Sequence, residues 1–222
     1  MELTPHLHAF LWTSPGANNC NTYLMRSPEK NILVDPGHAA YFDHVREGLR
    51  QLDLTVEDID LVICTHAHPD HIEAVHLFAE TAALFALHAV EWRLVEEMAP
   101  LLKSSMHIDL SLFAPDFFLA EGALTVGDIV LDVYHTPGHS PGAISLFWPQ
   151  EKALFSGDLV FKGGLGRTDL PGGDGEQLKD SIRRLAALDA AWLLSGHGEV
   201  LSGAEAVVEN FDLVERTWFG YV

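Results

Sequence analysis

Residues 65–71 read Thr-His-Ala-His-Pro-Asp-His, and they come directly after an apolar run at 59–64 that predicts a buried strand. Because residues two apart in a strand point to the same side, His66 and His68 can point together where the chain leaves that strand. Three imidazoles and one carboxylate within six residues are ligands that zinc, iron or manganese accept in proteins. The segment therefore predicts a metal-binding loop at the end of a strand.

The second half of this segment adds Asp70 and His71, which follow a bend at Pro69 and can face a neighbouring point at the start of a helix. At this composition a given window matches His-x-His-x-Asp-His about once in 65,000 by chance. The alternative interpretation is a polar loop with several exposed histidines, which would match the His-x-His-x-Asp-His pattern only by chance.

Three further loops present a histidine or an aspartate directly after an apolar predicted strand. They carry His139, Asp158 and His197. Taken singly, each residue fits a turn, a surface position or a helix cap. Because an α/β sheet gathers its active-site loops at the ends of its strands, the shared position favours one common site.

Strand-like and helix-like runs alternate along the whole chain without a linker or low-complexity segment, which predicts one α/β domain over residues 1–222. Apolar residues at helical spacing predict helices at 39–52, 72–80, 89–102, 176–188 and 205–214. Compact apolar runs predict strands at 20–26, 31–34, 59–64, 129–134, 143–148, 152–155 and 191–194.

The composition is that of a globular protein with a strongly acidic surface. Thirteen Lys and Arg residues against 32 Asp and Glu residues give a formal net charge of -19. Such a charge repels phosphate backbones and anionic lipids, so neither a nucleic-acid nor a membrane partner is expected. Cys20 and Cys64 are too few for a disulfide framework, and residues 1–12 lack a basic targeting region. A cytoplasmic location is therefore expected.

The ordered set of motifs resembles the metallo-β-lactamase superfamily, and within it the hydrolases of the glyoxalase II type. The resemblance rests on 66–71, on His-Thr-Pro-Gly-His at 135–139, on Ser-Gly-Asp at 156–158 and on Gly-His at 196–197. It implies an αββα sandwich of two mixed β-sheets flanked by helices. Long-form glyoxalase II has a helical C-terminal extension, whereas this chain ends 25 residues after His197, so the resemblance is to a short form.

The resemblance also implies two divalent metal ions, with zinc first and iron or manganese as alternatives. The implied ligands are the histidines and aspartates of the motifs: His66, His68 and His139 for one ion, Asp70, His71 and His197 for the other, and Asp158 as the bridge. Asp70 is also the residue expected to orient the catalytic water. Asp35, after the predicted strand 31–34, either orients a histidine through its second ring nitrogen or simply starts a turn.

The activity that the resemblance implies is hydrolysis of a small thioester such as S-lactoylglutathione by a hydroxide shared between two metal ions. Lys162 and Arg167 are candidate substrate-binding residues in a Gly-rich stretch, with salt bridges to Asp169 or Asp174 as the alternative interpretation. The expected partner is thus a small acyl substrate. The oligomeric state is left open, with a homodimer among the options.

Other activities fit the same motifs. Persulfide dioxygenases share the fold and use a single iron held by two histidines and one aspartate, here His66, His139 and Asp158. A lactonase or a β-lactamase would use the same metal ions on a different acyl bond. A metal-binding or electron-transfer scaffold is the non-enzymatic alternative.

Overall fold

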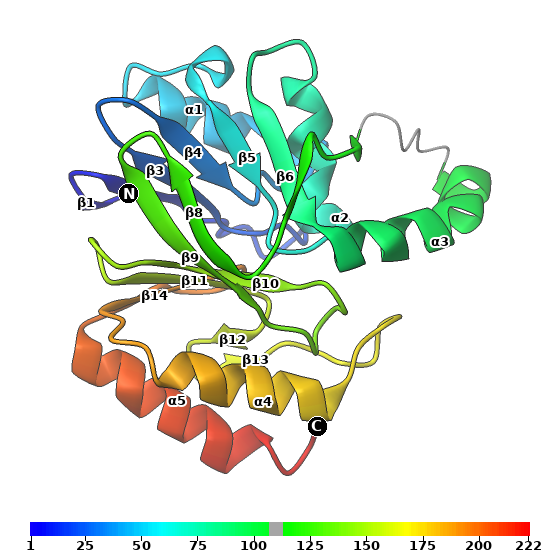
Figure 1. Ribbon diagram of the computed structural model, residues 1–222, viewed down its shortest axis with the longest axis vertical. Coiled ribbons are helices and arrows are strands. Elements are labelled where there is room, and N and C mark those ends of the chain that lie inside the picture. The colour runs from blue at the N-terminus through cyan, green and yellow to red at the C-terminus, as the bar shows by residue number, and fades with distance from the viewer. Residues whose placement is uncertain (107–112) are drawn as a thin grey trace. The chain divides into compact units, whose positions relative to one another are not determined.

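The computed structural model describes residues 1–106 and 113–222. Within these ranges the chain divides into two compact units, Met1–Leu119 and Ala120–Val222. Each unit is built around a large mixed β-sheet and has its own hydrophobic core (Figure 1). The single domain over residues 1–222 stays a prediction.

The sheet of the first unit has seven strands that lie side by side in sequence order. Each of the first four strands is antiparallel to its neighbour in this group, whereas β4 to β7 run parallel. The strands are β1 (Glu2–Thr4), β2 (Leu7–Phe10), β3 (Thr22–Arg26), β4 (Asn31–Val34), β5 (Leu61–Ile63), β6 (Leu84–His88) and β7 (Phe117–Leu119). Because parallel strands end at the same edge of a sheet, the segments that follow β4, β5 and β6 meet there.

Helices pack on this sheet through their apolar sides. The first long helix buries Val45 and Leu49 in a core that also contains Leu24 and Leu33 of the sheet. The helices are α1 (Asp43–Arg50), the single turn α2 (Pro69–Ile72), α3 (Ala89–Met106) and the 3-10 helices η1 (Ala39–Tyr41), η2 (Val56–Asp58) and η3 (Glu73–Phe78).

The second unit contains a six-stranded sheet in the order β15-β14-β11-β10-β9-β8. Only β11 and β14 are parallel neighbours, and β9 runs in the same direction as β11 because both are antiparallel to β10. The strands are β8 (Gly122–Val126), β9 (Ile129–His135), β10 (Ile144–Trp148), β11 (Ala153–Gly157), β14 (Trp192–Ser195) and β15 (Leu201–Ser202), and a separate ribbon pairs β12 (Val160–Phe161) with β13 (Gly164–Leu165). The loops after β9, β11 and β14 therefore open at one edge.

Two helices of the second unit, α4 (Gly175–Ala186) and α5 (Ala204–Trp218), lie side by side (Figure 1). Asp174 caps α4, because its side chain accepts the backbone N–H of Gln177. The apolar sides of the two helices form one core with the sheet, through Leu178, Ile182, Leu185, Val207, Phe211 and Val214.

The predicted architecture of two mixed β-sheets with flanking helices is confirmed. The helix predicted at 72–80 differs, because α2 ends after one turn and continues as η3. An α-helix would pair the N–H of Ala74 with the carbonyl of Asp70, but Ala74 donates to Gly37 and Asp70 accepts from Cys20. Over the described ranges, no helix is both long enough and apolar enough to cross a bilayer.

Candidate functional site

The predicted metal-binding loop at 65–71 lies in the first unit, where it follows β5 and continues into α2, the helical turn that contains Asp70 and His71. His66 Nε2 lies 3.0 Å from His68 Nδ1, and the ring centroids of His66 and His71 are 4.1 Å apart. The ligand atoms of Asp70 and His71 lie within 4.8 Å of each other. The structure thus brings together all four residues predicted from this motif, and all except the half-buried His68 are buried.

Asp35 orients His71. It follows β4 with a left-handed backbone (φ 53°) and is 2% exposed. Its carboxylate accepts the backbone N–H of Thr65 at 2.7 Å and the Thr65 hydroxyl at 2.8 Å, and it lies 3.0 Å from His71 Nδ1. A carboxylate only accepts hydrogen bonds, so His71 carries its proton on Nδ1 and its lone pair on Nε2. The predicted contact between Asp35 and a histidine is confirmed.

His66 is oriented one step further along the same chain of hydrogen bonds. The Thr65 hydroxyl donates its hydrogen to Asp35, so it accepts from His66 Nδ1 at 3.2 Å. The lone pair of His66 is then on Nε2, the nitrogen that faces His68. Both oriented rings therefore present Nε2 as the ligand atom.

Two residues that the sequence analysis did not single out hold the same loop. Asn18 Nδ2 donates to Asp70 Oδ2 at 2.6 Å, and the Ala67 N–H donates to Glu91 Oε1 at 2.9 Å. These partners are 52 and 24 residues apart in sequence, so no local pattern identifies them. The available signal is weak: Glu91 is the single acidic residue in the first turn of a helix that directly follows a strand.

The second unit assembles the other three predicted ligands. His139 lies in the loop after β9, Asp158 directly follows β11, and His197 comes two residues after β14. Asp158 Oδ2 lies 3.7 Å from His139 Nε2 and 3.2 Å from His197 Nε2. The expectation that separate strand ends gather these side chains is met within this unit.

A close backbone approach orients His139. Its Nδ1 lies 2.8 Å from the carbonyl oxygen of Arg167. Because a carbonyl only accepts, Nδ1 carries the proton and Nε2 carries the lone pair that points towards Asp158. Gly166 makes this approach possible, since a Cβ there would lie 1.8 Å from the carbonyl oxygen of Asp158.

The two candidate substrate-binding cations both form ion pairs. Arg167 Nε lies 2.6 Å from Asp169 Oδ1, and its guanidinium lowers the pKa of the Asp169 carboxyl to about 2. Lys162 Nζ lies 2.5 Å from Glu199 Oε2, which lowers the pKa of Glu199. These pairs are well exposed to solvent, and a role in substrate binding stays a prediction.

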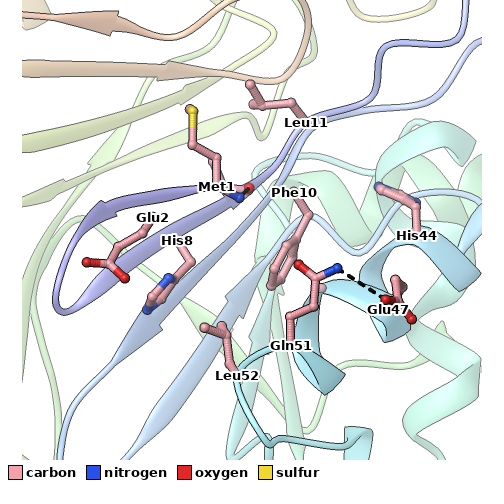
Figure 2. A pocket seen from close by; sticks show the side chains of 11 residues that line it. Met1, Glu2, His8, Phe10, Leu11, His44, Glu47, Gln51 and Leu52 are labelled. Carbon is pink, nitrogen blue, oxygen red and sulfur yellow. Dashed lines mark hydrogen bonds between the residues drawn. The ribbon is translucent and has the colours of Figure 1, made fainter.

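A cavity of about 480 Å³ in the first unit is a separate feature (Figure 2). It lies between the β1-β2 hairpin and α1, and its lining includes His8 and Phe10 of β2 and, on the other side, His44 and Gln51. On the α1 side of the cavity, Gln51 donates to Glu47 at 3.1 Å. None of the sequence-predicted site residues lines this cavity.

The family profile described as Metallo-beta-lactamase superfamily matches residues 15–197. The chain belongs to this superfamily. Within the metallo-β-lactamase superfamily it is 34% identical to a probable metallo-hydrolase of Methanocaldococcus jannaschii, over 81% of this chain and 88% of the relative.

Two further similar proteins have names that mention a substrate or a metal. The hydroxyacylglutathione hydrolase GloC of Haemophilus influenzae is 32% identical, over 81% of this chain and 85% of that protein. A protein solved in a di-iron-bound form superposes with a TM-score of 0.69 at 31% identity, over 89% of this chain and 92% of that one. The resemblance stated from the motifs is thus confirmed at the level of the superfamily.

The two clusters fit divalent metal ions by their chemistry. Each offers only imidazole and carboxylate ligand atoms, which suit zinc, iron and manganese. Two nitrogens bound to one tetrahedral zinc ion are about 3.4 Å apart, close to the 3.0 Å between His66 Nε2 and His68 Nδ1. The thiols of Cys20 and Cys64 are buried and donate to backbone carbonyls.

Proposed function

We propose that this chain is a metallo-hydrolase with two divalent metal ions, which cleaves a small thioester such as S-lactoylglutathione. Zinc is the first candidate for the ions, and iron and manganese are the alternatives. The proposed ligands are His66, His68 and His139 for one ion, Asp70, His71 and His197 for the other, and Asp158 for both.

The observation that carries the proposal is the orientation of the imidazoles. Asp35, the Thr65 hydroxyl and the Arg167 carbonyl each hold Nδ1 of one histidine as a donor, so that Nε2 carries the lone pair. Histidines that bind metals commonly donate their second ring N–H to a carboxylate or a carbonyl in this way. These three histidines are also buried, whereas His44 and His76, whose Nδ1 atoms contact carbonyls of nearby residues, are only half-buried.

The chain's own residues would orient the reactants. When bound, the divalent ions would supply an ionised water at neutral pH and polarise the acyl carbonyl. The Asn18 amide holds Asp70 Oδ2 at 2.6 Å, which restricts the rotation of this carboxylate. Asp70 can then accept a hydrogen bond from the attacking water and aim it at the carbonyl carbon.

The thioester assignment has two supports. A superfamily relative at 32% identity is a hydroxyacylglutathione hydrolase, and Lys162 and Arg167 offer cations for an acidic thiol carrier. Both side chains are exposed, and surface ion pairs are worth only about 0–1 kcal/mol. Their present partners, Glu199 and Asp169, could therefore be exchanged for a substrate carboxylate.

The test is a joint measurement of metal content and substrate preference. Protein prepared without added metal is analysed for zinc, iron and manganese, and then assayed with S-lactoylglutathione, a lactone, a β-lactam and glutathione persulfide. Chelated protein and the same protein after metal is restored serve as the matched control. About two ions per chain, with the thioester turned over fastest, is the expected result.

Two other outcomes would identify a different activity. One iron per chain with oxygen consumption on the persulfide would replace the hydrolase by a dioxygenase. Faster turnover of the lactone or the β-lactam would leave the proposed metal ions in place, but the acyl bond assigned to the substrate would change from a thioester to a lactone or a β-lactam. Metal-loaded protein that hydrolyses none of the three acyl substrates would contradict the proposal.

A further inference from the structure

Glu91 lies at the edge of the first unit where the metal-binding loop emerges. It is in the first turn of α3, which begins directly after β6. β6 pairs in parallel with β5, the strand that leads into the loop. The register of the sheet therefore places the start of α3 beside the His66–His68 segment, although the two are more than twenty residues apart in sequence.

The environment of the Glu91 carboxylate is unusual for an acidic residue at a helix start. Acidic side chains in a first turn are favoured by the helix dipole and are ordinarily solvated. Glu91 is instead 1% exposed, and burying a carboxylate costs free energy unless it is hydrogen-bonded or paired. Its Oε1 accepts the N–H of Ala67 at 2.9 Å, a charge-assisted bond of the stronger kind.

Ala67 is the residue between His66 and His68, so its N–H belongs to the peptide group that joins it to His66. Fixing this N–H restricts the rotation of that peptide plane, and with it the relative direction of the two imidazoles. Asp35 holds the N–H of Thr65 in the same way at 2.7 Å. Two buried carboxylates, one after β4 and one at the start of α3, thus hold alternate amides of one short loop.

We propose that Glu91 is a positioning residue, which sets the spacing of His66 Nε2 and His68 Nδ1 for a single metal ion. The inference rests on the proposed function only in taking His66 and His68 as ligands of one ion. It does not depend on the substrate. Glu91 acts through Ala67 and is not itself a ligand in this proposal.

The test compares Glu91→Gln and Glu91→Ala with Asp116→Asn. Asp116 is the matched control, because its Oδ2 accepts the N–H of Phe85 at 2.7 Å on the neighbouring strand β6. It also accepts a backbone N–H in the same unit, but its side chain is exposed and its partner lies in β6, not in the loop. Zinc affinity is measured by competition with a chromogenic chelator, and the visible spectrum of the cobalt-substituted protein reports the ligand geometry.

We expect Glu91→Ala to weaken the affinity for the first metal ion about 10- to 100-fold, the range found for residues that orient metal ligands. The cobalt bands should shift, and kcat should fall while KM changes less than about twofold. Glu91→Gln keeps an acceptor oxygen and should recover part of the affinity. Asp116→Asn should leave affinity and spectrum unchanged, and it should cost less thermal stability than Glu91→Ala because Asp116 is exposed.

A different pattern would overturn the inference. Unchanged zinc affinity and cobalt spectrum in both Glu91 variants would do so, as would a loss of affinity in Asp116→Asn that matches that of Glu91→Ala. If Glu91→Ala does not fold, Glu91→Gln alone decides through the spectrum. Should the unaltered protein bind metal but cleave no thioester, the proposed function fails while the affinities still test Glu91.

Discussion

Individual acceptors decide which ring nitrogen carries the lone pair in three of the candidate ligand histidines. His71 is set by Asp35, His66 by the Thr65 hydroxyl and His139 by the carbonyl of Arg167. An acceptor opposite Nδ1 fixes the proton there and the lone pair on Nε2. Changing an acceptor into a donor should therefore impair metal binding even though every ligand remains.

Asp35→Asn is the direct test of this point. The amide nitrogen of the new side chain can donate to His71 Nδ1, which moves the ring proton to Nε2 and opposes ligation. We expect a 10- to 100-fold loss of metal affinity and a loss of about 1–3 kcal/mol in the free energy of unfolding, because the buried network is broken. Isothermal titration and chemical denaturation measure the two effects.

The control is Asp60→Asn, since Asp60 also accepts a backbone N–H, that of Asn31 at 2.9 Å. The Asp60→Asn variant should be less stable than the unaltered protein, but its metal affinity should be unchanged. Equal affinities of Asp35→Asn and the unaltered protein would show that the ring orientation does not matter.

Arg167 carries the second prediction at the scale of single residues. Its exposed pair with Asp169 is weak enough to open for a substrate carboxylate. Arg167→Ala should raise KM for an acidic thioester about tenfold with kcat nearly unchanged, because uniform binding is lost. Steady-state kinetics measure this, with Lys152→Ala as control, since Lys152 pairs with Asp189 at the surface. A fall in kcat alone would contradict the assignment.

At the scale of elements, the Gly-rich stretch around the β12-β13 ribbon packs so closely against the backbone near Asp158 that one of its positions has no room for a side chain. A Cβ at Gly166 would lie 1.8 Å from the carbonyl oxygen of Asp158, whereas at Gly164 the nearest atom is 3.9 Å away. Gly166→Ala should cost roughly 1–3 kcal/mol or more through overpacking and move the Arg167 carbonyl away from His139.

Gly164→Ala is the matched variant and should be tolerated. Thermal unfolding and metal analysis of the two proteins test the pair. If both substitutions have equal effects, the close approach at Gly166 has no special role.

The ion pair that joins the start of β8 to α4 predicts a pH dependence. Arg184 contacts Glu121 through two bonds of 2.6 and 2.8 Å and lowers the pKa of that carboxyl to about 2. A depressed pKa in the folded state means that the stabilisation is complete above the ordinary value near 4.5 and is lost as the pH falls towards 2.

Glu121→Gln should therefore lower the free energy of unfolding by about 0.2–1 kcal/mol at neutral pH, since the pair is half exposed. The difference from the unaltered protein should shrink between pH 4.5 and 2, as followed by chemical denaturation across this range. Glu176→Gln is the control, because its pair with Lys179 stays inside α4. A difference that is constant with pH would refute the mechanism.

Helices and strands were predicted correctly where a single apolar pattern ran through the segment. The prediction failed where that pattern was interrupted or where hydrogen bonds to distant residues changed the local structure. The strand at 31–34 was predicted with its observed bounds, because a compact apolar run has few alternatives. Strand β2 was missed, since His8 interrupts the apolar run although its side chain is buried in the sheet. The helix at 72–80 failed for another reason, because distant residues take the hydrogen bonds that would have extended α2.

At the scale of the whole molecule, metal removal should lower stability. Ions that bind only the folded chain stabilise it by mass action, by about 4 kcal/mol at a concentration a thousand times Kd. For a protein of this size 1 kcal/mol corresponds to about 2–4 °C. Chelation should thus lower the unfolding temperature by roughly 10 °C, and added zinc should restore it. Calorimetry checks this, and an unchanged transition after complete metal removal would contradict it.

The sequence predicted the superfamily and the four-residue cluster of the first unit, because the spacing of 66–71 along a strand end and one helical turn is local. It also predicted that Asp158 and two histidines follow separate strands, and the second unit gathers them. The sequence did not predict the roles of Asn18 and Glu91. They act through contacts set by strand order, which no short pattern encodes.

The burial of both cysteines bears on the proposed thioester hydrolysis, which would release a thiol. Cys20 and Cys64 have no solvent-exposed surface, and burial raises the pKa of the Cys64 thiol well above its ordinary value. Neither sulfur can therefore act readily as a nucleophile. The liberated carrier, or a disulfide formed from it, would meet no reactive sulfur on the enzyme, so turnover in an oxidising cell need not end in a mixed disulfide.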